Sequence, residues 1–448
     1  MKVQIFKTWN YVRYSFWFLP AVMIAGVVAL AFTTVALDQR ATDWLTANWG
    51  WTFTGGAEGA SSLLGVIAGS MITIAGVVFS MTLVALSLAS SQLGPRLLRT
   101  FMRDTTTQVV LGVFVATFLY CLIVLRTIRR ADEVTFVPHL SVSLGVLLAV
   151  LSVGVLIYFI HHVSISIQAN EIVARVAKEL IGEINHLFPK DLGQGERRAP
   201  IEPPDASFLD ALERDACPVD ATGDGYIQFI DGDALMALAM QEDVIIRLTG
   251  GPGHYVVAGS PLALVWPATR MTDPIAERIN SAFVMGSQRT SGQDIEFVIN
   301  QLVEIAVRAL SPGVNDPFTA VTCVDHLGSA LCRLVQQDMP SPFRYDTQEQ
   351  LRVIALVVTF PDAMDAAFNQ IRQYGRSSAA LTIRQLETIA VVARFAHRPE
   401  DRDALLRHAK MIARGAREGL PEREDRKRVE DRYQSVSQAL SESADSAT

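Results

Sequence analysis

Residues 59–95 read GASSLLGVIAGSMITIAGVVFSMTLVALSLASSQLGP and contain no Asp, Glu, Lys, Arg or His. A charged side chain at bilayer depth costs about 2.5 kcal/mol or more, and a helix needs about 20 apolar residues to cross the hydrocarbon core. An uncharged run of this length is typical of a membrane-spanning helix. The chain is therefore predicted to be a membrane protein.

Three other apolar runs accompany this one, so we expect four spans, at residues 15–37, 63–90, 109–125 and 140–160. Each is close to the length that a bilayer requires. The first is longer than the ~7 to 15 apolar residues of a secretory signal, so it is expected to remain as an anchor. Together the spans predict a four-helix transmembrane domain at residues 1–162.

Charge and cysteine content argue against several classes of partner. The 448-residue chain has a net charge of −7, and it has few basic patches, whereas nucleic-acid binding usually needs a concentrated basic face. The four cysteines form no close pair of the zinc or redox type, so we expect reduced structural thiols. No nucleic-acid partner, metal or cofactor is expected.

The placement of Lys and Arg predicts the orientation in the membrane. Positive residues precede the first span and follow the second: Lys2, Lys7, Arg13, Arg96, Arg99 and Arg103. By the positive-inside rule, both termini and the soluble half face the cytoplasm, although Arg126, Arg129 and Arg130 in the third loop argue for the opposite side. Arg96, Arg99 and Arg103 share one face of a short helix, which fits either contact with anionic lipid or the cytoplasmic mouth of an oligomeric pore.

A stripe of small and hydroxylated residues follows the second span. Its members recur at spacings of three and four or their sum, which places them on one helical face; they are Gly69, Thr73, Gly76, Ser80 and Ser87. One interpretation is close helix packing, for which Gly65 and Gly69 are suitably spaced. The other is a pore lining that solvates a permeating ion or small solute.

The soluble half changes character along its length. We expect a helical stalk and linker at 163–216, a small β module at 217–268, a helical domain at 269–422 and a charged, partly disordered tail at 423–448. Residues 251–262 resemble half of a barrel-sandwich module of the biotinyl type, but no lysine lies between 191 and 290, so a swinging-arm role is excluded. Residues 220–231 imitate a calcium loop, yet Asp231 replaces the bidentate Glu, and a polar turn is the better interpretation. The predicted fold class is thus a mostly α membrane protein with a small β module.

One polar constellation stands apart in the helical domain. It comprises Arg289, Asp294, Gln301, Arg308, Asn315 and Asp316. Asp294, Gln301 and Arg308 are spaced by seven, so they lie along one side of a helix, and Arg308 could pair with Asp294 or Asp316. Either the cluster binds a ligand, or it is structural, with Asn315 or Asp316 as the N-cap of a helix whose first residue is Pro317.

The strings QRT…QD (288–294) and ALSPGVNDPFTA (309–320), together with the four spans, resemble the bacterial family of predicted membrane proteins called domain of unknown function 2254. The resemblance covers most of the chain. It implies this architecture and a bacterial inner-membrane location, and it brings no established reaction or substrate.

The sequence shows no phosphate loop, metal-binding His-Glu pair or nucleophile elbow, so catalytic residues are not expected. The leading hypothesis is a homo-oligomeric inner-membrane channel or transport-type pore with a cytoplasmic assembly or regulatory domain. The alternative is a membrane-anchored signalling or scaffold protein whose cytoplasmic helical domain binds a ligand or partner. A membrane hydrolase comes third.

Overall fold

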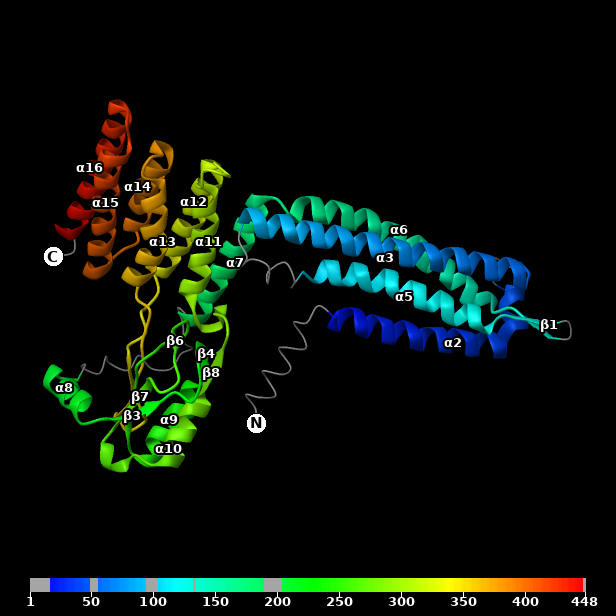
Figure 1. Cartoon of the computed structure of the whole chain (residues 1–448), viewed down its shortest axis with the longest axis horizontal. Helices are drawn as coiled ribbons and strands as arrows, with labels where there is room; N and C mark the ends of the chain where they lie inside the picture. Colours follow the sequence, from blue (N-terminus) through cyan, green and yellow to red (C-terminus); the bar gives the residue numbers. More distant parts are fainter. Residues whose placement is uncertain (1–16, 49–54, 94–103, 132–133, 189–203, 446–448) are drawn as a thin grey trace. The chain divides into compact units, whose positions relative to one another are not determined.

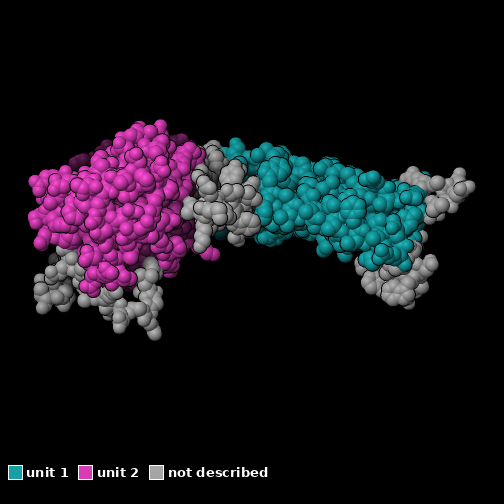
Figure 2. All heavy atoms as spheres, turned by 90° about the horizontal axis from the view of Figure 1, so that it is seen from below, with its two compact units in different colours: residues 1–171 teal, residues 172–448 magenta. Residues whose placement is uncertain are grey.

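The computed structural model describes residues 17–48, 55–93, 104–131, 134–188 and 204–445. The chain divides into two compact units, residues 1–171 and residues 172–448, which are coloured separately in Figure 2. Each unit is considered by itself. The expected cluster of Arg96, Arg99 and Arg103 lies outside the described residues.

In the described part of unit 1, four long helices run side by side (Figure 1). They are α2 (Phe18–Asn48), α3 (Ala57–Leu93), α5 (Thr105–Thr127) and α6 (His139–Ser166). Each is long and apolar enough to cross a membrane, which confirms the four predicted spans. A short antiparallel hairpin, β1 (Arg129–Ala131) and β2 (Val134–Phe136), joins α5 to α6.

Helix α5 forms the centre of unit 1, because it packs against α2, α3 and α6. Half of its apolar span (50%) is buried, compared with 17 to 22% for the other three. Close approaches occur where glycine faces a neighbour: a Cβ on Gly112 would lie 2.6 Å from the Met23 sulfur, and one on Gly145 would lie 3.0 Å from Leu64 Cδ2. These two glycines, and not Gly65 and Gly69, allow the helices of one chain to approach closely.

Asp38 of α2 forms hydrogen bonds with the first turn of α6. Its carboxylate is buried and accepts hydrogen bonds from Leu140 N (2.9 Å), Ser141 N (2.9 Å) and Ser141 Oγ (2.6 Å). The N-cap residue of α6 is Pro138, which has no side-chain cap, so Asp38 satisfies backbone N–H groups that the helix leaves open. The Tyr120 hydroxyl adds a bond to Ser141 O at 3.1 Å. A buried polar network therefore ties α2, α5 and α6 together.

Helix α6 does not continue into the predicted stalk. Ile167 and Gln168 interrupt it, because Gln168 N bonds to Ile165 O in a tighter turn, and α7 (Ala169–Leu187) starts afterwards. Its apolar residues recur at helical spacing and are buried; they are Ile172, Val173, Val176, Leu180 and Ile184. A further helix, α8 (Ala206–Arg214), precedes the sheets.

Unit 2 contains two sheets that share one core. The larger has the order β3 (Cys217–Asp220), β7 (Pro261–Trp266), β5 (Ile245–Leu248), β10 (Leu351–Ile354) and β9 (Phe343–Tyr345), with β10 parallel to β5 and the other neighbours antiparallel. The smaller is antiparallel, with the order β6 (Tyr255–Val256), β4 (Gly225–Ile230) and β8 (Phe283–Gly286). Helices α9 (Gly232–Glu242) and α10 (Asp273–Ala282) contribute Leu235 and Ile279 to the core between them. Strands from beyond residue 268 thus complete both sheets.

A group of helices stands side by side beyond the sheets in Figure 1. They are α11 (Ile295–Ala309), α12 (Pro317–Leu334), α13 (Phe360–Gly375), α14 (Ala379–Ala393), α15 (Pro399–Gly419) and α16 (Arg423–Asp445). Side-chain caps begin several of them, including Asp294 on α11, Asp316 on α12 and the Thr359–Asp362 capping box on α13.

The charged segment expected as a partly disordered tail forms α16 over nearly its whole length and packs on α14 and α15. The physical reason is a narrow apolar stripe, because Val429, Val436 and Leu440 are buried at spacings of seven and four. The high charge of the segment lies on the remaining faces.

Candidate ligand-binding cavity

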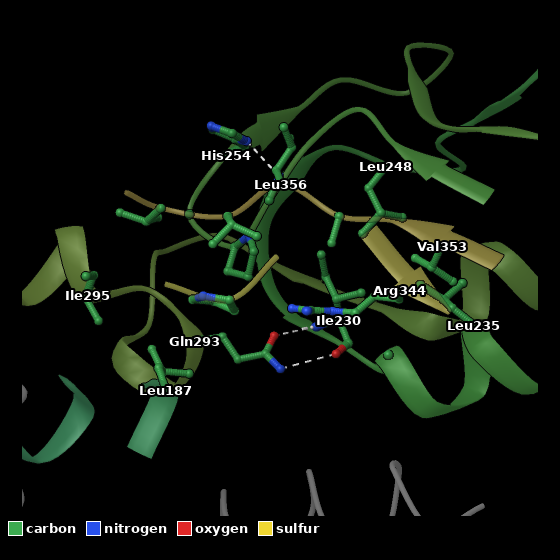
Figure 3. Close-up of a pocket in the computed structure, with 18 of the residues that line it drawn as sticks. Leu187, Ile230, Leu235, Leu248, His254, Gln293, Ile295, Arg344, Val353 and Leu356 are labelled. Carbon is green, nitrogen blue, oxygen red and sulfur yellow. Dashed lines mark hydrogen bonds between the residues drawn. The ribbon is translucent and has the colours of Figure 1, made fainter. Parts of the chain in front are cut away.

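Unit 2 encloses a cavity of about 670 Å³, shown in Figure 3. It lies among the end of β4, the start of α9, β5, β9 and β10, the 251–254 turn and the first turn of α11. Most of its wall is apolar, with Ile230, Leu235, Met236, Leu248, Val353 and Leu356 as the main contributors. Pockets of ~300 to 1,000 Å³ with apolar walls and a few charged groups are typical ligand sites.

The QRT…QD string contributes Arg289 and Gln293 to the wall of this cavity, and it is hydrogen-bonded to β4. The amide of Gln293 accepts from Ile230 N at 2.9 Å and donates to Ile230 O at 3.2 Å, as the dashed lines in Figure 3 show. Thr290 Oγ1 donates to Gln228 O at 3.3 Å, and Gln228 Nε2 donates to Gln288 O at 2.7 Å. The polar residues of the string therefore bond to Gln228 and Ile230 of β4, which lie beyond the two residues that β6 pairs with.

Arg289 and Asp294 form a bidentate ion pair beside the cavity. Arg289 Nε donates to Asp294 Oδ2 and Nη2 donates to Oδ1, both at 2.8 Å, and the carboxylate is 3% exposed. Asp294 also accepts from Phe297 N at 3.0 Å as the N-cap of α11. Burial by itself would lower the pKa of Arg289, but the hydrogen bonds and charge of Asp294, together with the charge of Glu296, raise it above its ordinary value. The Arg289 guanidinium is held in its charged form.

Gly253 lets the neighbouring turn approach this ion pair. Its φ is +88°, and a Cβ there would lie 2.2 Å from Asp294 Oδ2. Gly253 N donates to Ile227 O at 2.8 Å, so the turn is bonded to β4 as well. Only glycine combines this backbone conformation with so close a contact.

Glu296 adds an acid with a perturbed pKa to the same end of the cavity. Burial raises the pKa of its carboxyl, the charge of Asp294 raises it further, and Arg289 opposes both. His254 lies at the edge of the cavity, where its Nδ1 accepts from Gly251 N at 2.7 Å, so its Nε2 carries the proton in the neutral ring. Neither residue stands out in the sequence, although His254 lies within the string 251–262 and Glu296 follows the string 288–294.

Arg344 is the second arginine of the wall. It lies on β9, opposite Val353 of β10, and Figure 3 places it beside Ile230, Leu235 and Val353. Burial lowers the pKa of its guanidinium, and it has no hydrogen bond or ion pair within the part of the chain that the structure describes. Sequence reasoning missed Arg344, because the short strand that carries it follows prolines and lacks a periodic pattern.

The structure separates the predicted polar constellation into two groups. Arg289 and Asp294 meet at the first turn of α11, whereas Asn315 and Asp316 follow its last turn, about 20 Å away along a 15-residue helix. Of the two carboxylates considered for Arg308, Asp294 is bound by Arg289 instead. Asp316 is confirmed as the N-cap of α12, since it accepts from Thr319 N at 3.1 Å with Pro317 in the first turn.

Gln301 lies between these groups on α11. It is 4% exposed, and its Oε1 has no hydrogen-bond partner among the described residues. Asn315 adopts a left-handed conformation with φ of 51° in the α11–α12 turn. Neither residue lines the cavity, so the sequence string 309–320 is accounted for as a helix-to-helix turn.

The stripe on α3 lies on the outer face of unit 1. Gly69, Thr73, Gly76, Ser80 and Ser87 are all exposed, and they lie opposite the buried residues of the helix, such as Leu64, Met71 and Val78. Thr73 Oγ1 donates to Gly69 O of its own helix at 2.8 Å. The stripe therefore lines no passage within a single chain.

Among the described residues, no group of three or more His, Cys, Asp or Glu side chains is arranged to hold a metal ion. In the segment that imitates a calcium loop, Asp231 caps α9 by accepting from Ala234 N at 3.0 Å, and Asp224 accepts from Ala258 N at 2.6 Å. Both side chains thus serve the local backbone.

Four helices long and apolar enough to cross a membrane, together with a second unit that contains a cavity of mixed polarity, define a membrane protein of two units. The chain belongs to the family described as predicted membrane protein (DUF2254), whose sequence model matches residues 13–391. Uncharacterized proteins of Mycobacterium tuberculosis (strain H37Rv) and Mycobacterium bovis are each 34% identical over 385 residues, which cover 84% of this chain and 72% of theirs. No solved structure matches the chain.

Proposed function

We propose that the protein is a membrane-anchored binding protein for a small molecule, which unit 2 holds in its cavity. The observation that carries this proposal is the cavity itself, because its volume of about 670 Å³ and its mixture of apolar walls with charged groups match those of ligand sites. The four spans keep this binding unit at the membrane. The distribution of positive residues supports a cytoplasmic position for unit 2 at the bacterial inner membrane.

A neutral aromatic probe, 2-naphthalenemethanol, tests whether the cavity accepts a ligand. Leu356 is 49% exposed at the cavity wall, so Leu356→Trp should partly fill the opening and weaken probe binding about tenfold. Equilibrium dialysis of the full chain in phosphatidylcholine nanodiscs measures the binding, with empty nanodiscs as background.

Val391→Trp is the matched control, because Val391 is 47% exposed on α14 and does not line the cavity. It should bind the probe as the wild type does. Binding no greater than that of empty nanodiscs would contradict the proposed function, and equal weakening by both variants would place the probe elsewhere.

A homo-oligomeric pore is the second candidate, and the exposed stripe on α3 favours it. A Cβ on Gly69 or Gly76 would meet nothing within 4 Å, so this small polar face is free for other copies of the chain. Around an oligomer axis its hydroxyls would solvate an ion or small solute.

Substitution of the stripe tests this second candidate. Ser80→Leu and Gly76→Leu should reduce salt flux through reconstituted liposomes severalfold, because the larger side chains narrow and dry the lining. Met81→Leu serves as the control, since Met81 is also exposed on α3 but points well away from the stripe. Flux that is unchanged in all three variants, or absent from the wild type, would remove the pore assignment.

A further inference from the structure

The Arg344 guanidinium has no hydrogen-bond acceptor or ion-pair partner among the described residues, although a partly buried cation normally has one. Guanidinium groups stay protonated in proteins, so a guanidinium that is withdrawn from water needs hydrogen-bond acceptors to replace it. The other arginine of the cavity, Arg289, has Asp294 at 2.8 Å and Glu296 at 3.8 Å. Arg344 has no such neighbour among the described residues.

The cavity is lined by three acids, Asp233, Glu296 and Asp362, and none of them forms an ion pair with Arg344. Asp233 is exposed in the first turn of α9. Asp294 binds Arg289, and Asp362 accepts from Thr359 N at 2.9 Å in the capping box of α13. Glu296 interacts with Asp294, Arg289, Asp362 and His254. Among the described residues, no carboxylate forms an ion pair with Arg344, and burial lowers the pKa of its guanidinium.

The surroundings of Arg344 are apolar. Ile230, Leu235 and Val353 lie beside it in Figure 3, and Val353 shares its sheet face as the cross-strand partner. These three side chains belong to the apolar wall of the cavity. A molecule that contacted them would place its polar end within reach of the guanidinium.

We propose that the cavity binds a small organic carboxylate with an apolar body, and that Arg344 holds the carboxylate. The planar guanidinium matches a carboxylate with two parallel hydrogen bonds, and the apolar wall takes the body of the ligand. This inference rests on the proposed function, because it names the class of ligand for the same cavity.

The test compares 2-naphthoate with its neutral analogue 2-naphthalenemethanol on the full chain in phosphatidylcholine nanodiscs. The wild type should bind naphthoate about tenfold more tightly, because charge-assisted hydrogen bonds are added to the same apolar contacts. Arg344→Gln should remove this preference and leave the binding of naphthalenemethanol unchanged. Arg344→Lys should keep part of the preference for naphthoate, because lysine retains the positive charge but cannot form the two parallel hydrogen bonds of a guanidinium.

Arg333→Gln is the control for loss of a positive charge, since Arg333 is exposed on α12 and does not line the cavity. It should retain the full preference for naphthoate. Naphthalenemethanol binding without a preference for naphthoate would overturn the inference and leave the proposed function standing. Absence of binding for both probes would overturn both.

A third outcome would assign the partner of Arg344 to the chain itself. Residues 189–203, which lie outside the described ranges, include Asp191, Glu196 and Glu202. If naphthoate bound the triple variant Asp191→Asn/Glu196→Gln/Glu202→Gln tightly and the wild type only as weakly as Arg344→Gln, a chain carboxylate would occupy the site. The inference of an external carboxylate would then be wrong.

Discussion

Asp38→Ala is expected to lower the free energy of unfolding of unit 1 by about 3 kcal/mol or more, because it leaves the N–H groups of the half-buried Leu140 and the buried Ser141 without their acceptor. The Asp38 carboxylate accepts from the N–H groups of Leu140 and Ser141 and from the Ser141 hydroxyl. It also places a negative charge at the positive end of α6. A loss of this size should be visible as an earlier transition when the protein is unfolded with sodium dodecyl sulfate in mixed micelles and followed by circular dichroism.

Two variants calibrate the effect of Asp38→Ala. Ser141→Ala removes one of the three hydrogen bonds and should cost about 1 kcal/mol. Glu58→Gln removes an exposed acid from the first turn of α3 and should cost less than about 1 kcal/mol. If Asp38→Ala behaved like Glu58→Gln, the carboxylate would have no capping role for α6.

Gly253→Ala is the second substitution with a large expected effect, a loss of about 3 kcal/mol or more in the local stability of unit 2. A Cβ at this position would lie 2.2 Å from Asp294 Oδ2 and 2.8 Å from Arg289 Nη2, so the ion pair has to open. Opening leaves a buried carboxylate without its partner, which typically costs about 3 to 5 kcal/mol. The positive φ adds a further penalty for any residue with a Cβ.

Hydrogen exchange measured by mass spectrometry localises this loss. Faster exchange is expected at β4 and at the first turn of α11, because the turn, the strand and the helix cap share this ion pair and its hydrogen bonds. Gly259→Ala is the matched control: its φ is +82°, and its Cβ would meet nothing within 4 Å, so only about 1 kcal/mol should be lost. Equal effects at both glycines would show that backbone conformation, and not the contact with Asp294, decides the outcome.

The sequence predicts much of the membrane unit, because lipid imposes a length and a composition on each span. It does not predict how the spans pack. The glycines of the stripe on α3 meet no neighbour within one chain, whereas Gly112 and Gly145, which belong to no visible pattern, permit the close contacts. Asp38 belongs to no visible sequence motif. Its role depends on Leu140 and Ser141, which are distant in the chain.

Sequence reasoning was similarly divided in the soluble unit. Local chemistry identified Asp316 as a helix cap and marked the string 288–294 as unusual. The pairing of Arg289 with Asp294 was missed, because helical spacing favours Arg308 as the partner of Asp294. In the structure, η3 (Ser291–Gln293) turns the chain before α11, and Arg289 pairs with Asp294. Arg344 and Glu296 emerge as cavity residues only when β9 and α11 are placed in space, which no local period encodes.

The parallel pairing of β5 with β10 has a consequence for how the protein is made. Val353 of β10 pairs with Ile246 of β5, the central strand of the larger sheet. During synthesis, β5 therefore lacks one of its two neighbouring strands until residues 351–354 have left the ribosome. Until then β5 presents unpaired backbone groups next to a bilayer-bound nascent chain, and contacts of such long sequence separation form slowly. The residues of α11 and α12 lie between β5 and β10 in the chain, so they are synthesised before β10 can pair with β5.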